Sequence, residues 1–264
     1  MPTHQSLAGS SDEELLRRMV DTHADRYGET FWAFFTTRVA PSLPTRPVIV
    51  DLGCGPGLFL RDLGMRYPSA SLHGYDITPA MIAYGQQLAG VKLTLELHDV
   101  TAKPLPQAAG SVDLVSMSSV LHVFDEPLPV LAEIRRVLAP RGIFLLHDWI
   151  RQPLATYLAY RRDEIKETGP DATRRAFRLF PVHNKYTPDD WRWLLAEAGL
   201  ALRDHTQLRA SHQIFVSGAS KGPPNPPRSD SPRRSRGAPR YPVARYELLK
   251  AFIAVTRAGV PPNR

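Results

Sequence analysis

Apolar and polar residues alternate in two different rhythms along the middle of the chain. Short apolar or strictly alternating runs predict strands, and apolar residues spaced three or four positions apart predict helices that pack on them. The predicted strands lie at 48–52, 70–77, 92–100, 112–119 and 142–150, and the predicted helices between them at 58–67, 78–90 and 127–139. Strands joined by helix-length crossovers predict an α/β fold with a parallel sheet and helices on both of its faces.

The N-terminal segment has a helical pattern without strands. Residues 12–40 predict one or two amphipathic helices within a helical cap that spans 1–46. Its aromatic residues are dense for a surface helix: Tyr27, Phe31, Trp32, Phe34 and Phe35. This density is expected either for a helix that packs on the sheet or for a lid that covers a ligand.

Residues 151–186 interrupt the alternation of strand and helix. Two helices are predicted there, at 153–167 and 171–180, before a third that begins at Pro188 with Thr187 as its N-cap. Because this insert leaves the sheet after the fifth strand, we expect it to form a roof over the substrate.

The last part of the predicted domain contains two strands, at 201–208 and 211–218, close enough to form a hairpin. The sheet is therefore expected to have seven strands, mostly parallel, with an antiparallel strand at its end. The whole domain spans 47–218 and has a Rossmann-like arrangement.

The C-terminal tail differs from the rest in composition and charge. Ten of the 33 Lys and Arg residues, but only two of the 26 acidic residues, lie from Gly218 onward, so the preceding part is nearly neutral. Residues 219–243 are rich in Pro, Arg, Ser and Gly and predict a disordered linker. Residues 244–264 predict a short amphipathic helix that docks back or dimerises. Binding of a polyanion by this tail is the less favoured alternative.

The chain of 264 residues can bury one full α/β core. Its single cysteine, Cys54, excludes an intramolecular disulfide and suits a reducing compartment. The sequence shows no signal-peptide pattern and no apolar stretch of membrane-spanning length, so a soluble, cytoplasmic protein is expected, either a monomer or a homodimer.

A glycine-rich loop, Asp51-Leu-Gly-Cys-Gly-Pro-Gly57, directly follows the first predicted strand. A dinucleotide-binding fingerprint needs glycine at the first, third and sixth positions, and Leu58 stands at the sixth. No Gly-Lys-Ser/Thr follows, which excludes a phosphate-binding P-loop. The loop is therefore built for another ligand, which it would meet where the strands end.

These motifs resemble those of the class I S-adenosylmethionine-dependent methyltransferases, over about residues 25–218. "VIVDLGCGPG" is similar to the first motif of that family, "LHGYD" to the second and "HDV" to the adenine motif. "VDLVSMSSVLHVF" and "LAEIRRVLAPRGIFLLHDW" resemble the fourth motif and the segment that follows it. The likeness is greatest to the small-molecule branch that includes the ubiquinone and menaquinone C-methyltransferases.

The resemblance implies that S-adenosylmethionine is the cofactor and that one set of residues binds it: Tyr27, Asp51, Gly53, Gly55, Gly57, Asp76, Ile77, Met81, Asp99, Val100 and Met117. In this reading the glycines cradle the methionine part, and Asp51 holds the loop or the amino group. Asp76 accepts hydrogen bonds from the ribose hydroxyls, and Ile77 packs on the adenine. Cys54 is expected to be structural.

The other members of this set have implied roles at the two ends of the cofactor. Asp99 accepts a hydrogen bond from the adenine amino group, and the Val100 N–H meets a ring nitrogen. Met117, just past the fourth strand, approaches the methionine end.

Methyl transfer needs positioning and desolvation, and a base only if the acceptor must lose a proton. The candidate catalytic residues are His122 after the fourth strand, His147 at the end of the fifth and Tyr160 in the insert. Other rings of the insert, among them Tyr157, suit an aromatic or amphipathic acceptor.

Several reactions are excluded by missing motifs. "SMSS" stands where the DNA amino-methyltransferases have Asn/Asp-Pro-Pro-aromatic, and no cysteine is placed for pyrimidine C5 methylation. No Asp-Asn pair or Cys/His cluster predicts a metal. The sequence thus predicts methylation of a small molecule at an O, N, S or C atom, with nucleic acid disfavoured. An RNA or protein methyltransferase and a noncatalytic S-adenosylmethionine-binding protein stay open as alternatives.

Overall fold

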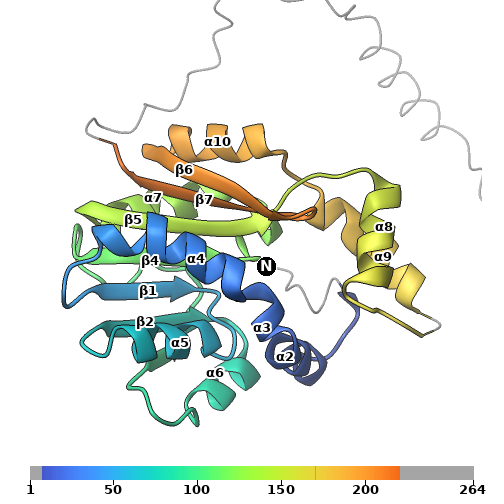
Figure 1. Ribbon diagram of the computed structural model, residues 1–264, viewed down its shortest axis with the longest axis horizontal. Helices are drawn as coiled ribbons and strands as arrows, with labels where there is room; N and C mark the ends of the chain where they lie inside the picture. The colour runs from blue at the N-terminus through green and yellow to red at the C-terminus, as the bar shows by residue number, and fades with distance from the viewer. Residues whose placement is uncertain (1–7, 170, 221–264) are drawn as a thin grey trace, which may run out of the picture. The chain divides into compact units, whose positions relative to one another are not determined.

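The computed structural model describes residues 8–169 and 171–220, whose strands form one seven-stranded sheet (Figure 1). The strands are β1 (Val48–Leu52), β2 (Ser71–Asp76), β3 (Thr94–Leu97), β4 (Val112–Ser118), β5 (Leu138–Trp149), β6 (Leu200–Arg209) and β7 (His212–Ala219). Their order is β3-β2-β1-β4-β5-β7-β6, and only β7 runs antiparallel to its neighbours. The predicted seven-stranded, mostly parallel sheet with one antiparallel strand is confirmed, but this strand, the last in the chain, lies between β5 and β6 and not at the edge.

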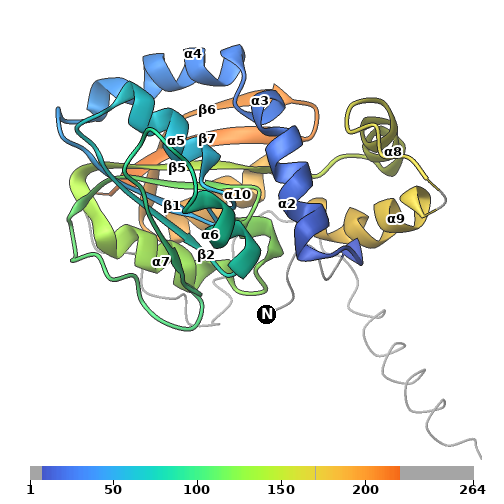
Figure 2. The ribbon, with the colours of Figure 1, turned by 90° about the horizontal axis from the view of Figure 1, so that it is seen from below.

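Two layers of helices cover the sheet, because its central strands have apolar residues on both faces. One layer contains α7 (Pro127–Val137) and α10 (Pro188–Glu197), whose buried residues join those of β4 and β5 in one core. The opposite layer contains α4 (Glu29–Arg38), α5 (Leu58–Arg66) and α6 (Pro79–Gly85), which share a second core. Figures 1 and 2 show α4 and α5 on one face of the sheet and α7 and α10 on the other.

The sequence left open whether the N-terminal helices pack on the sheet or cover a ligand, and different helices lie at these two places. Phe31 and Phe35 of α4 are buried against the sheet, so this helix is a packing element. The preceding α2 (Asp12–Asp21) and α3 (His23–Arg26) lie instead beside the carboxyl ends of the strands (Figure 2). A capping box begins α2, in which Ser11 and Glu14 satisfy each other's backbone N–H groups.

The insert consists of α8 (Leu154–Asp163) and α9 (Ala172–His183), at the same end of the sheet as α2 (Figure 2). Their apolar residues form a small separate core with Trp149 at the end of β5. Thr187 and Asp190 form the capping box expected at the start of α10.

Some element boundaries differ from the sequence expectation. Helix α6 ends at Gly85 instead of reaching residue 90, and Gly85 lies so close to the Pro56 carbonyl that a Cβ there would be 2.9 Å from its oxygen. Strand β5 begins at Leu138, because Leu138 pairs with Val112 before a register shift that resumes at Ile143. The Thr78 side chain accepts no capping hydrogen bond from the first turn of α6, and the Thr78 backbone N–H donates to Asp76.

The predicted linker at 219–243, beyond its first two residues, and the predicted helix at 244–264 lie outside the described residues. Within the described part of the chain, no helix is both long and apolar enough to cross a membrane.

Candidate active site

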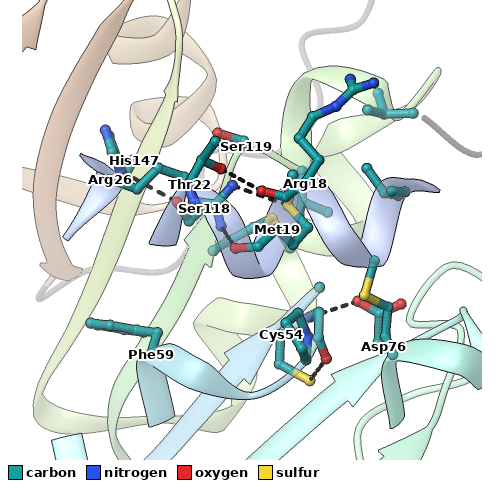
Figure 3. A pocket seen from close by; sticks show the side chains of 18 of the residues that line it. Arg18, Met19, Thr22, Arg26, Cys54, Phe59, Asp76, Ser118, Ser119 and His147 are labelled. Carbon is teal, nitrogen blue, oxygen red and sulfur yellow. Dashed lines mark hydrogen bonds between the residues drawn. The ribbon is translucent and has the colours of Figure 1, made fainter. Parts of the chain in front are cut away.

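A cavity of about 790 Å³ opens at the carboxyl ends of the parallel strands. Its wall is built from the loops after β1, β2, β3, β4 and β5, and from α2, α3, α8 and the turn between β6 and β7. The strand order reverses between β1 and β4, which is where ligands bind in open sheets of this kind. Figure 3 shows the side chains that face this space.

The glycine loop folds back on β2. The N–H groups of Gly53 and Cys54 both donate to the Tyr75 carbonyl, at 2.7 and 3.1 Å. Gly53 has φ +68°, and a Cβ there would lie 2.4 Å from a methyl group of Val120. Only glycine therefore fits this close approach between the loop and the segment after β4.

Gly57 has a structural position. It has φ +73° immediately before α5, and a Cβ there would lie 2.9 Å from Leu95, but Gly57 does not line the cavity. Of the three predicted glycines, Gly53 and Gly55 line the cavity, and Gly57 shapes the turn behind them. Cys54 also lines it, with its sulfur directed at Gly74 of β2, and burial raises the pKa of its thiol.

Asp76 holds the glycine loop in place. Its carboxylate accepts hydrogen bonds from the Gly55 N–H at 2.8 Å and from the Thr78 N–H at 2.9 Å, and the first is visible in Figure 3. Burial raises the pKa of Asp76. The residue thus lies at the predicted place and has a positioning role in addition to the predicted contact with ribose.

Asp51 is almost fully buried at the end of β1. Its carboxylate accepts a hydrogen bond of 2.6 Å from the Ser116 hydroxyl on β4. Burial raises its pKa to about 7, although the Ser116 hydrogen bond acts in the opposite direction. A nearby cation, such as an ammonium group of a ligand, would stabilise the ionised form of this carboxylate.

The remaining predicted cofactor residues all line the cavity: Tyr27, Ile77, Met81, Asp99, Val100 and Met117. The Tyr27 ring stacks on Phe59 with a centroid distance of 4.6 Å. The Asp99 carboxylate is bound by the Thr101 N–H and hydroxyl, which lower its pKa and keep it ionised. The exposed apolar side chain of Ile77 offers a surface in the cavity on which a flat ring can pack.

His147 and Tyr160 line the cavity, as expected of candidate catalytic residues. The Nδ1 atom of His147 lies 3.3 Å from the Ser118 hydroxyl, and its buried Nε2 atom has no hydrogen-bond partner within the described ranges. Burial lowers the pKa of His147 to about 4, so the ring is neutral at pH 7 and can accept a proton or a hydrogen bond.

His122 does not face the cavity, and its prediction as a catalytic residue is corrected. Ser119 adopts φ +56°, which turns the chain into the short helix η2 (Leu121–Val123). His122 is buried there, and its Nδ1 atom lies 2.7 Å from Asp148. Tyr157 of the insert is likewise buried away from the cavity, with its hydroxyl 2.9 Å from Nδ1 of His183.

Other lining residues were not found from the sequence. Arg18, Met19, Thr22 and Arg26 come from α2 and α3, and Arg209 and His212 from the β6–β7 hairpin. The antiparallel pairing of Trp149 with His212 brings the hairpin turn to the same edge as the carboxyl end of β5. Because the sequence predicted the hairpin, it could have indicated that the hairpin turn lies near the end of β5. No feature of the sequence indicated that the α2 residues line the cavity.

The described residues contain no group of three or more His, Cys, Asp or Glu side chains that could hold a metal ion.

The sequence is similar both to a protein family and to individual known proteins. Residues 50–146 match a family described as a methyltransferase domain. The malonyl-[acyl-carrier protein] O-methyltransferase of Legionella pneumophila is 33% identical over 97 residues, which are 37% of this chain and 34% of the relative. The ubiquinone biosynthesis O-methyltransferase of Cereibacter sphaeroides is 27% identical over 209 residues, 71% of this chain and 83% of the relative. The chain thus spans about a third of the Legionella relative and most of the Cereibacter one.

Solved structures show the same fold. A protein of Pyrococcus horikoshii OT3 has a TM-score of 0.56 and 20% identity, covering 75% of this chain and 91% of that protein. The CMeT domain of the citrinin polyketide synthase has a TM-score of 0.59 and 16% identity, covering 83% of this chain and 59% of that one. Residues 50–146 are thus similar to a methyltransferase domain, and the described part of the chain has the fold of these solved structures.

Proposed function

We propose that the protein transfers a methyl group from S-adenosylmethionine to a small-molecule acceptor inside this cavity. The observation that carries the proposal is the arrangement around the glycine loop, where Asp51, Asp76 and Asp99 follow successive strands and all line one space. A volume of about 790 Å³ is typical of a small-molecule site. Cofactor and acceptor must share it, which leaves room for a small acceptor or for the end of a larger one.

The chain's own residues suit the cofactor. When bound, S-adenosylmethionine supplies a methyl group activated by its positive sulfur. Asp51 offers a buried carboxylate to the amino group, and Asp76 and Asp99 offer acceptors to the ribose and the adenine. The exposed Ile77 and the buried Met81 offer apolar contact to the adenine ring.

The reaction forms a bond between the acceptor atom and the methyl carbon while the carbon–sulfur bond breaks, and the electron pair stays on sulfur. An acceptor that bears a proton must release it. His147 is the candidate to take it, since it lines the cavity and its buried Nε2 has no partner among the described residues. Helices α2 and α8 line the cavity, and a bound acceptor would displace water from between them.

The relatives support a small acceptor. They include proteins named as trans-aconitate 2-methyltransferases and ubiquinone biosynthesis O-methyltransferases. An aromatic or amphipathic acceptor, a cytoplasmic location and a monomeric or homodimeric state are parts of the same proposal. Among the insert residues, Tyr160 supports the aromatic preference because it lines the cavity.

Calorimetry on the full chain tests the cofactor. The protein should bind S-adenosylmethionine and S-adenosylhomocysteine but not NAD, and Asp76→Ala should weaken this binding by about 1–3 kcal/mol through the loss of charged hydrogen bonds. Asp163→Ala is the matched control, because Asp163 is exposed, outside the cavity and paired only with Arg162. Equal affinity in wild type and Asp76→Ala would remove Asp76 from the site.

Turnover separates the alternatives. Transfer of labelled methyl groups is measured with a panel of small acids, phenols and amines, and in parallel with total RNA and protein. Labelling of small molecules supports the proposal. Labelling of RNA or protein alone, or cofactor binding without any turnover, would support one of the two alternatives instead.

A further inference from the structure

We infer that the acceptor carries an anionic oxygen group, a carboxylate or a phosphate, which Arg26 and Arg209 bind at the end of the cavity beside β5 and β7. The inference rests on the proposed function and specifies its substrate class. Arg26 ends α3 and Arg209 ends β6, and both line the cavity. Both are among the charges that lower the pKa values of His147 and His212, which places the two guanidinium groups at the same end.

Neither arginine is neutralised by the protein. In the described parts of the chain, the ion pairs within 4.0 Å include neither Arg26 nor Arg209. Arg26 donates to the carbonyl oxygen and the sulfur of Met19, at 2.6 and 3.1 Å, which uses two of its five N–H groups (Figure 3). No hydrogen bond of the Arg209 side chain to another described residue is seen. A partly buried guanidinium without a counter-ion is costly unless a ligand supplies one.

The acidic residues of the cavity lie elsewhere. Asp51, Asp76 and Asp99 are at the ends of β1, β2 and β3, on the other side of the strand-order reversal. The two remaining acidic lining residues, Asp25 and Glu164, are exposed. The cavity thus has an acidic end and a basic end.

Arg161, another arginine in the cavity wall, differs from these two because it has a carboxylate partner. Arg161 also lines the cavity, but Glu167 pairs with it, and the same carboxylate pairs with Arg175 at 2.9 Å. Arg161 therefore serves the structure of the insert. Arg26 and Arg209 have no such partner and are available for a ligand.

The carboxylate of the cofactor itself is a poor match for Arg209. Strands β1 and β7 are separated by β4 and β5, which is about 14 Å at the usual spacing between strands. The glycine loop that receives the methionine part is at the end of β1, whereas Arg209 is at the turn that leads into β7. His147, the candidate base, lies on β5 between these two positions. An anion held at Arg209 therefore lies on the acceptor side.

Calorimetry on the full chain tests the inference with simple probes, after saturation with S-adenosylhomocysteine. The probes are benzoate, hexanoate and phenyl phosphate, with benzamide and hexanamide as neutral partners. At least one anion should bind ten times more tightly than its neutral partner or, for phenyl phosphate, than benzamide. Arg26→Gln and Arg209→Gln should each lower that affinity at least tenfold, and Arg209→Lys should restore part of it, because lysine keeps the charge.

The control is Arg203→Gln, on the same strand as Arg209 but exposed and outside the cavity, which should bind the probes like wild type. Anions that bind no better than amides, or full affinity in Arg209→Gln, would overturn the inference. It would also be overturned if either variant lost affinity for S-adenosylhomocysteine alone and kept that for the anions, because the arginine would then hold the cofactor. Failure of wild type to bind S-adenosylhomocysteine at all would instead refute the proposed function.

Discussion

The two ends of the cavity solve the same electrostatic problem with opposite charges. At the acidic end, which we propose binds the cofactor and call the cofactor end, Asp51 and Asp76 are buried, and burial raises their pKa values. At the basic end, which we propose binds the acceptor and call the acceptor end, His147 and His212 are buried, and burial lowers theirs. In both cases the low-dielectric surroundings favour the uncharged form. A cationic ligand would favour the ionised carboxylates at the acidic end. At the basic end, Arg26 and Arg209 are the groups that suit an anion.

The two ends also differ in how they are held. The cofactor end is fixed by hydrogen bonds between the glycine loop and β2, from Gly53 to the Tyr75 carbonyl and from Gly55 to the Asp76 carboxylate. The acceptor end is assembled from side chains of α3, α8, β5 and the hairpin turn. Changes at the first end should therefore affect folding and cofactor binding together. Changes at the second should affect the acceptor alone.

The largest expected effect is on the pH dependence of stability at the cofactor end. In the unfolded chain Asp51 loses its proton near its ordinary pKa of 3.8, whereas in the folded protein it keeps the proton up to about pH 7. Between these values the native state holds the extra proton, so stability falls as pH rises, by roughly 4 kcal/mol in total at about 1.4 kcal/mol per unit. The difference in unfolding free energy between wild type and Asp51→Asn should therefore fall by this amount from pH 4 to 8 in denaturant unfolding, which separates this contribution from those of other groups.

Asp163→Asn is the control for this prediction, because Asp163 is exposed and its pKa is lowered by its hydrogen bond with Arg162. Its difference in unfolding free energy from wild type should not show this fall with pH. A difference between wild type and Asp51→Asn that does not change with pH would mean that Asp51 is ionised in the folded protein. If Asp51 also holds the amino group of the cofactor, affinity for S-adenosylhomocysteine should rise with pH up to about 7 in wild type but not in the variant.

The opposite slope is expected at the acceptor end. The unfolded chain protonates His147 below its ordinary pKa of 6.5, but the folded protein does so only near 4. Between these values the unfolded state holds the extra proton, so stability rises with pH by on the order of 3 kcal/mol. The difference in unfolding free energy between wild type and His147→Asn should rise by this amount from pH 4 to 7, while affinity for S-adenosylhomocysteine at pH 8 stays within about 1 kcal/mol. A difference that does not change with pH would show that the folded protein protonates His147 at its ordinary pKa.

A smaller effect is expected from a methyl group in the glycine loop. Gly53→Ala adds a Cβ 2.4 Å from Val120 at a residue with φ +68°. The unfolding free energy should fall by about 2–4 kcal/mol, from the left-handed backbone and the overpacking together. Binding of S-adenosylhomocysteine should weaken with it.

Gly110→Ala separates these two causes. Gly110 has φ +70° but no atom within 4 Å of an added Cβ, so this variant should lose only the backbone contribution of about 1–2 kcal/mol and bind the cofactor normally. Equal losses in the two variants would mean that the contact with Val120 relaxes without cost.

The smallest effect is expected outside the cavity. Tyr157→Phe removes the hydroxyl that lies 2.9 Å from His183 in the insert, and should lower the unfolding free energy by about 1 kcal/mol. Its affinity for S-adenosylhomocysteine and its turnover should stay within twofold of wild type, whereas Tyr160→Phe, within the cavity, should change turnover. Loss of turnover in Tyr157→Phe would show that the insert core also controls the acceptor end.

The sequence by itself determined the features that depend on neighbouring residues. Alternating and apolar runs specified the strands and crossovers, the Thr187–Asp190 capping box specified the start of α10, and Asp51 and Asp76 were placed because each ends a strand. These are local rules, since period, capping and turn chemistry act over a few residues. Parallel strands then bring their carboxyl ends to one edge, which is why the acidic end of the cavity could be predicted as a group.

Only the tertiary structure decided which side chains complete the other end. His122 and His147 had similar sequence signals, yet the turn at Ser119 directs His122 toward Asp148 and leaves His147 in the cavity. Arg26 and Arg209 are 183 positions apart and meet through the packing of α3 and the register of the β6–β7 hairpin. Such convergence depends on how separate elements pack, and no periodicity or spacing along the chain encodes it.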